Sequence, residues 1–152
     1  MKKRENKFRA WDDRLRIMFD GDMIEESPNL KSFLSYGVLC VGSFRDDEDF
    51  YDLTLLEFTG FRDKNGKDIF EGDIVCLEKI DGVKYVAQVR FFNGAFCIYT
   101  SNADINVTSI KGHNVLIHID YDWEEYRPFY EVIGNIYENK DLLKSTYEAK
   151  GN

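Results

Sequence analysis

The chain has 152 residues, a length that suits one ordinary domain and buries most of its apolar surface without disulfide or metal staples. Its 28 acidic residues outnumber its 20 Lys and Arg residues, and the net charge of −8 opposes non-specific nucleic-acid binding unless a local basic patch overrides it. Three cysteines without C-x-x-C spacing (Cys40, Cys76 and Cys97) exclude a zinc ribbon or a secreted disulfide framework. No apolar run approaches the ~18 residues of a membrane span, so we expect a cytoplasmic protein that has no contact with a membrane.

The first predicted element is a β-hairpin near the start of the chain. Residues 8–11 alternate between polar and apolar types, Asp12-Asp13 marks a turn, and residues 15–20 alternate again. The dipeptide Asp20-Gly21 is typical of a turn and closes the run.

The same region is locally basic, with seven Lys and Arg residues against three acids over positions 2–16. One interpretation is a solvated arm that leads into an edge strand, which is the commoner role of short basic starts. The other is an arm that binds an acidic partner or a nucleic acid, and both stay open.

Residues 29–36 follow Ser27-Pro28, and their apolar side chains Leu30, Phe33 and Leu34 have helical spacing. A short helix is therefore predicted there, with Asn29 as its N-cap. The next segment, residues 45–52, is rich in Asp and Glu. Its carboxylates suit a hard cation, but the spacing is not that of an EF-hand loop, so a solvated acidic loop is the favoured interpretation.

Four further strands and their turns are predicted between residues 53 and 100. Residues 53–58 carry apolar side chains on both faces, and Thr59-Gly60 is expected to end that strand. The Asn-Gly pair in 63–67 and the segment Glu71-Gly72-Asp73 predict tight turns before a buried strand at 74–77. Residues 85–92 and 95–100 form the clearest hairpin of the sequence.

Beyond residue 100 the patterns predict strands at 115–119 and 130–137 and a short C-terminal helix capped by Asn139. The fold class predicted from the whole pattern is mainly β: meandering antiparallel strands that form a partly open, SH3-like or related barrel, with one or two short helices. We expect a single domain over 1–152, in which a small N-terminal β lobe (1–52) packs on a barrel (53–147).

Three segments carry a resemblance to a known family. They are Lys7-Phe8-Arg9-Ala10-Trp11-Asp12, the stretch 59–75 that reads TGFRDKNGKDIFEGDIV, and residues 131–139, which read EVIGNIYEN. All three, in this order, resemble the YopX family of phage and prophage proteins, and the resemblance spans nearly the whole chain. It implies the fold and a phage or prophage origin in a bacterial host, and it supplies no catalytic residues.

No phosphate-binding loop, dinucleotide fingerprint, zinc-protease motif or nucleophile elbow occurs in the sequence. The two histidines, His113 and His118, bracket the strand predicted at 115–119. One of them could act as a general base beside Asp120 or Asp122, but ordinary loop and strand positions are the simpler interpretation. We therefore expect no catalytic, cofactor-binding or metal-binding residues, and no cofactor.

Four aromatic residues beside several acids form the candidate interaction surface, Trp123, Tyr126, Phe129 and Tyr130. Aromatic side chains dominate the energetic centres of protein interfaces, although the edge of a core beneath a solvated loop gives the same pattern. The expected function is that of an accessory protein, not an enzyme, that binds a host or phage protein or self-assembles into a homo-oligomer. Two alternatives from other classes are a small Mg-dependent enzyme of phage nucleic-acid metabolism and a nucleic-acid-binding module that uses the basic arm.

Overall fold

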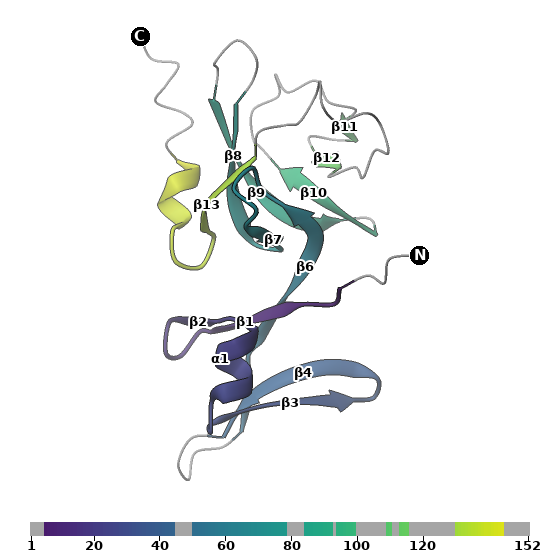
Figure 1. The fold of residues 1–152 in the computed structure, drawn as a ribbon, viewed down its shortest axis with the longest axis vertical. Helices are drawn as coiled ribbons and strands as arrows, with labels where there is room; N and C mark the ends of the chain where they lie inside the picture. Colours follow the sequence, from purple (N-terminus) through teal and green to yellow (C-terminus); the bar gives the residue numbers. More distant parts are fainter. Residues whose placement is uncertain are drawn as a thin grey trace. The chain divides into compact units, whose positions relative to one another are not determined.

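The structure is a computed structural model that describes residues 5–44, 50–78, 84–92, 94–99, 109–110, 113–115 and 130–144, with the backbone alone for 77–78, 109–110 and 113–115 (Figure 1). Two compact units divide the chain: unit 1 is residues 1–58 and unit 2 is residues 59–152. Each unit is described by itself. The fold is mainly β with very little helix, and one of its sheets is a curled half-barrel, which confirms the predicted fold class.

Unit 1 is built from two small antiparallel sheets and one short helix. The elements are β1 (Phe8–Asp12), β2 (Ile17–Phe19), α1 (Gly21–Glu26), β3 (Leu30–Ser35), β4 (Val38–Ser43), β5 (Tyr51–Asp52) and the first part of β6 (Thr54–Arg62). In the first sheet β1 lies between β2 and β6, and in the second β4 lies between β3 and β5. The hairpin predicted over residues 8–20 is confirmed as β1 and β2.

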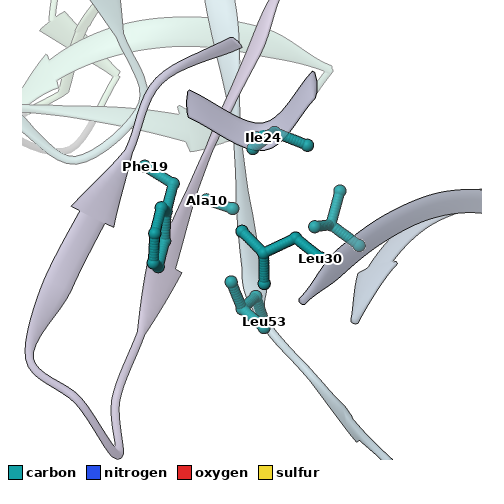
Figure 2. Packing of buried hydrophobic residues seen from close by; sticks show 6 residues of the cluster. Ala10, Phe19, Ile24, Leu30 and Leu53 are labelled. Carbon is teal, nitrogen blue, oxygen red and sulfur yellow. The ribbon is translucent and has the colours of Figure 1, made fainter. Parts of the chain in front are cut away.

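The core of unit 1 collects apolar side chains from nearly all of these elements. Figure 2 shows members of this cluster, which consists of Ala10, Phe19, Ile24, Leu30, Val41 and Leu53. Two further side chains, Tyr51 and Leu55, pack against it. Because Ile24 is the buried residue of α1, this single side chain fixes the helix on the core.

The helix predicted over residues 29–36 is wrong, because that segment is strand β3. Six consecutive residue pairs join β3 to β4, from Leu30↔Ser43 to Ser35↔Val38, and a two-residue turn connects the strands. The helical spacing of the apolar residues was fortuitous: cross-strand pairing, which a local pattern does not contain, outweighs it. The helix of unit 1 lies earlier, where the carboxylate of Asp20 accepts a hydrogen bond from the amide of Met23 at 2.9 Å and caps α1. The dipeptide Asp20-Gly21 is thus a helix start.

Unit 2 contains the meander and the C-terminal elements. Its elements are the rest of β6, then β7 (Asp68–Phe70), β8 (Asp73–Glu78), β9 (Lys84–Phe92), β10 (Ala95–Tyr99), β11 (Ser109–Ile110), β12 (His113–Val115), β13 (Glu131–Asn135) and the 3-10 helix η1 (Lys140–Leu143). The strand order of the six-stranded sheet is β11-β12-β10-β9-β8-β13, and β7 neighbours β6. The hairpin predicted over residues 85–100 is confirmed as β9 and β10, which pair from Ala95↔Phe92 to Tyr99↔Gln88.

A second apolar cluster forms the core of unit 2, and it consists of Ile69, Val75, Ala87, Val89 and Ile98. Three partly buried side chains pack against it, Phe61, Tyr130 and Val132. The cluster therefore joins β8, β9 and β10 to β6 and β7, which precede them in the chain, and to Tyr130 and Val132, which follow them.

Two local predictions in unit 2 need correction, and one is confirmed. Thr59-Gly60 does not end β6, which continues to Arg62 because the Thr59 hydroxyl donates to the carbonyl of Ile69 at 2.8 Å and Gly60 absorbs a φ of +90°. The tight turn predicted at 63–67 is confirmed, because the amide of Gly66 donates to the carbonyl of Asp63 at 2.9 Å and Gly66 has a positive φ. The Asn139 side chain does not cap η1, since its Oδ1 accepts from the amide of Asn135 instead.

The strand predicted at 130–137 is confirmed in its first part as β13. Of the strand predicted at 115–119, only Val115 lies within the described residues, at the end of β12. Among the described residues, no helix is long and apolar enough to cross a membrane.

Candidate functional site

The strongest candidate for a functional surface is the β3–β4 hairpin of unit 1, whose tip has an unusual turn. Tyr36 and Gly37 connect the strands, and both have positive φ angles, 49° and 82°. That pair of angles is the signature of a type I′ turn, in which Asn or Gly is the favoured first residue. A bulky side chain in this left-handed conformation is strained by about 1–2 kcal/mol, and the ring of Tyr36 is fully exposed. Burial of the Tyr36 ring therefore contributes no free energy that would offset this backbone strain.

Apolar side chains flank this turn on both strands and are also exposed. Leu34 is 72% exposed and Val38 is 63% exposed. Directly paired residues of antiparallel strands point to the same side of the sheet, so the register Leu34↔Leu39 and Ser35↔Val38 places Leu34 and Val38 on opposite faces. The tip of the hairpin is therefore apolar on both faces.

Three phenylalanine rings extend the apolar surface along the face that carries Val38. The ring of Phe50 lies 5.5 Å from that of Phe33 and 4.8 Å from that of Phe44, both in tilted arrangements. A Cβ atom on Gly42 would lie 1.8 Å from the Phe50 ring, so the glycine makes room for it. Because Phe44 and Phe50 are 45% and 42% exposed, this cluster is in contact with water. We call Phe33, Leu34, Tyr36, Val38, Phe44 and Phe50 the hairpin surface.

The electrostatics of the hairpin differ from those of the chain as a whole. Residues 29–44 contain one charged side chain, Lys31, whereas the chain has a net charge of −8. The Lys31 ammonium group lies 5.1 Å from the centroid of the Phe44 ring, a cation–π distance. The hairpin is thus an apolar, acid-free segment of an acidic protein.

The aromatic interaction surface predicted from the sequence falls mostly outside the described residues. Trp123, Tyr126 and Phe129 lie there, and Tyr130 alone is described. Tyr130 packs against the core of unit 2, and burial raises the pKa of its hydroxyl to about 12. Tyr130 is therefore a partly buried residue beside that core, and the interaction surface as a whole stays a prediction.

The candidate titratable and metal-binding groups are also only partly described. His113 lies on β12 with its backbone alone described, and His118 lies outside the described residues. Of the acidic loop, residues 45–49 lie outside them, and Asp52 follows in β5. The described part of the chain contains no group of three or more His, Cys, Asp or Glu side chains placed to hold a metal ion.

Three described basic residues of the N-terminal arm, Lys7, Arg14 and Arg16, have partners within unit 1. Lys7 forms a 2.8 Å ion pair with Glu5, and Arg16 forms a 2.9 Å ion pair with Asp13. The guanidinium of Arg14 stacks 3.9 Å from the ring centroid of Tyr51. A nucleic acid would compete with these contacts for the same groups.

The Tyr51 hydroxyl in turn donates to the buried carboxylate of Asp12 at 2.8 Å, and burial, followed by this contact, raises the pKa of Tyr51. Asp12 also accepts hydrogen bonds from the amides of Arg14 and Leu15, both at 2.9 Å. The carboxylate therefore organises the β1–β2 turn and ties it to β5, which is a structural task.

Cys97 is a buried cysteine of β10. Burial raises the pKa of the Cys97 thiol, which donates to the carbonyl oxygens of Ala95 and Phe92. A raised pKa keeps the thiol protonated and poorly nucleophilic. Cys40 and Cys76 are half-buried.

Sequence reasoning missed the hairpin surface because it assigned residues 29–36 to a helix. The available signal was the segment Leu34 to Val38, in which apolar residues flank a Tyr-Gly pair that can form a two-residue turn. Read as a hairpin, the same residues place apolar side chains at an exposed tip.

Comparison with known proteins gives a family and a fold. A family model described as "YopX protein" matches residues 7–144. Two crystal structures are similar: protein EF1440 from Enterococcus faecalis (23% identity, 93% of this chain and 99% of that chain, TM-score 0.51), and protein yopX from Bacillus subtilis (18% identity, 90% and 97%, TM-score 0.54). At these identities the structures support the fold alone. No curated protein matches the chain.

Proposed function

The chain belongs to the YopX family, and we propose that it is a phage or prophage accessory protein that acts in the host cytoplasm by binding protein through the hairpin surface. Its task on this proposal is recognition and not catalysis. The observation that carries the proposal is the exposure of apolar side chains on both faces of one strained hairpin tip, at Leu34, Tyr36 and Val38.

Two physical arguments support a binding role for this surface. Large contiguous apolar patches are uncommon on soluble monomers and usually mark interaction sites. In addition, positive φ at a bulky residue costs free energy that a purely structural hairpin would avoid with Asn or Gly at position 36. Both features occur at the same few residues.

The aromatic composition of the surface favours a protein as the ligand. Aromatic side chains supply large contact area at low cost in conformational entropy, and they are enriched where protein interfaces are strongest. The near absence of charge over residues 29–44 leaves no cationic cluster for phosphate groups. A nucleic acid is therefore a poorer match to this surface than a protein is.

The test is site-specific photo-crosslinking in the bacterial host with the full chain. A photoreactive amino acid at position 36 is expected to yield a defined protein adduct, and the same amino acid at Ile17, an exposed apolar position of β2 in the same unit, is expected to yield none. The double variant Leu34→Ser/Val38→Ser should abolish the adduct at position 36, whereas Ile17→Ser should preserve it. Circular dichroism establishes that both variants are folded. An adduct that survives the double variant contradicts the proposal.

A further inference from the structure

We infer that the open edge of β3 pairs with β3 of a second copy of this chain, so that two three-stranded sheets join into one continuous six-stranded sheet. The inference rests on the proposed function, since it names the partner of the same hairpin. It differs in mechanism, because it depends on backbone groups of the strand edge rather than on the exposed tip.

The register of the hairpin shows which backbone groups face this edge. The amide of Phe44 donates to the carbonyl of Asn29 at 2.8 Å, so the pair Asn29/Phe44 exchanges hydrogen bonds with β4. Bonded and non-bonded pairs alternate along an antiparallel ladder, and every second residue of β3 from Asn29 onward therefore bonds to β4. The amide and carbonyl groups of Ser32 and Leu34 consequently point away from β4.

Nothing in the described part of the chain pairs with that edge. β3 is the terminal strand of its sheet, with β4 on its other side. Natural proteins protect such edges with proline, a bulge, a very short strand or several charges. β3 has six residues in unbroken register, no proline, and one charge at Lys31. Its Ser32–Ser35 half thus has few of the usual protections against edge pairing.

A two-fold axis through Phe33 gives a self-complementary register. Ser32 then lies opposite Leu34 of the partner subunit, and the two pairs around the axis exchange four backbone hydrogen bonds. Phe33 lies opposite Phe33 of the partner subunit in a non-hydrogen-bonded pair, the closer of the two cross-strand arrangements, where an aromatic pair adds stability. The Phe33–Phe50–Phe44 clusters of both copies would then lie on one face of the joined sheet.

Charge also favours a second copy at this edge. In a chain of net charge −8, most surfaces of two copies would repel each other. Residues 29–44 contain no acid, and in this register Lys31 lies opposite Ser35 of the partner subunit, so like charges do not face each other. The hairpin is a surface at which two copies can meet without opposed carboxylates.

The expected dimer is of modest affinity. Four backbone hydrogen bonds and one aromatic pair form an interface at the small end of the range for specific complexes. We therefore expect a dissociation constant on the order of 10 µM, which sedimentation equilibrium can measure.

The first experiment tests the register by disulfide formation between two different single-cysteine variants, both made in the full chain with Cys40→Ser, Cys76→Ala and Cys97→Ala. Mixing Lys31→Cys chains with Ser35→Cys chains should give a mixed disulfide, because opposed non-hydrogen-bonded residues have Cα atoms about 4.5 Å apart. Neither variant alone should crosslink, since two copies of position 31 would be about 14 Å apart. A disulfide between two Lys31→Cys chains, or no mixed disulfide, overturns the inference.

The second experiment removes one edge donor. Ser32→Pro deletes an amide that points away from β4 and so leaves the hairpin's own hydrogen bonds intact, whereas Ser32→Ala keeps the amide. Sedimentation equilibrium should show a dimer for the wild type and for Ser32→Ala, and an at least tenfold weaker dimer for Ser32→Pro. A wild-type chain that stays monomeric at about 200 µM, far above the expected constant, overturns the inference.

These results are separable from failure of the proposed function. A monomeric wild type that still gives a photo-adduct at position 36 with another protein overturns the edge pairing and leaves the proposed function standing. A dimer that Ser32→Pro dissociates, together with an adduct that survives Leu34→Ser/Val38→Ser, supports the edge pairing and contradicts the proposed function.

Discussion

The carboxylate of Asp63 accepts a hydrogen bond from the amide of Val132 at 3.0 Å, across 69 positions of sequence. Its other oxygen accepts from the amides of Asn65 and Lys67 at 2.8 and 2.9 Å, so one side chain both shapes a turn and holds a distant strand. Asp63 lies in the family segment 59–75 and Val132 in the family segment 131–139. The two segments are therefore parts of one structural joint.

The first prediction is that Asp63→Asn destabilises the protein by about 1–3 kcal/mol, the range for a lost partner of a buried polar group. An amide oxygen can still accept from Asn65 and Lys67, but the amide nitrogen cannot accept from Val132. Urea unfolding measures the change. Asp68→Asn, which breaks an exposed ion pair with Arg62 in the same turn region, is the control and should change stability by less than about 1 kcal/mol.

The pH dependence of Asp63 gives a second readout of that prediction. Burial raises the pKa of Asp63, but the amides of Val132, Lys67 and Asn65 outweigh burial and lower it below its usual 3.8. A lowered folded-state pKa stabilises the protein above the unfolded-state value, and this stabilisation is lost as the pH falls through the folded-state value. Asp63→Asn should therefore weaken the loss of stability below about pH 4. If Asp63→Asn loses stability below about pH 4 as steeply as the wild type, the lowered pKa of Asp63 is contradicted.

The second prediction concerns alkaline pH. Burial raises the pKa of Tyr130 from 10.0 to about 12. Because the folded-state pKa is raised, the folded protein keeps its full stability below pH 10. As the pH rises toward 12, ionisation of Tyr130 lowers the free energy of unfolding by at most about 3 kcal/mol. Tyr130→Phe should therefore reduce the fall in unfolding free energy between about pH 9.5 and 11.5, the range in which the Tyr130 hydroxyl begins to ionise. Tyr36→Phe, which alters an exposed hydroxyl, should leave that fall unchanged.

The third prediction is that Tyr36→Asn stabilises the protein by about 0.5–1 kcal/mol while it weakens binding through the hairpin surface. Asn tolerates the positive φ at position 36 and forms an Asn-Gly type I′ turn with Gly37. Thermal unfolding measures the gain, and recovery of the protein partner on an immobilised chain measures the loss. A variant that is more stable and binds equally well would show that Tyr36 makes no functional contact.

The fourth prediction separates backbone strain from packing at two glycines with nearly equal φ. Gly66 (φ +81°) has nothing within 4 Å of an added Cβ, whereas at Gly72 (φ +82°) an added Cβ would lie 3.1 Å from the Tyr137 ring. Gly66→Ala should cost about 1–2 kcal/mol, the penalty of a left-handed alanine. Gly72→Ala should cost more, because Tyr137 must also move. Equal losses in urea unfolding would show that the ring of Tyr137 yields freely.

The family segment 131–139 contains a second set of contacts at the same joint. The carboxamide oxygen of Asn135 accepts from the amides of Tyr137 and Glu138 at 3.0 and 2.9 Å, and the amide of Ile136 donates to the carbonyl of Gly72. The short polar side chains and the glycine are thus required by the backbone at the joint. The described contacts of these two segments are therefore structural.

The sequence by itself determined the features that depend on neighbouring residues. The two-residue period over residues 85–92, with Asn93-Gly94 after it, was sufficient to predict β9 and β10, because a turn pair and this period leave few other structures. The same reasoning gave β1 and β2, the buried strand β8 and the mainly β fold class. The family followed from short segments in a fixed order.

Only the folded structure decided the features that depend on which segments pair or contact each other. Residues 29–36 have helical spacing, yet pairing with β4 makes them a strand, and this change moves Leu34 and Tyr36 from a helix to an exposed tip. The sequence likewise gave no indication that Asp63 reaches Val132, since the contact exists only after the meander has formed between them. Hydrogen bonds and packing between paired segments outweigh local preferences worth a few tenths of a kcal/mol per residue. For that reason the candidate surface was recognised in the folded protein and not in its sequence.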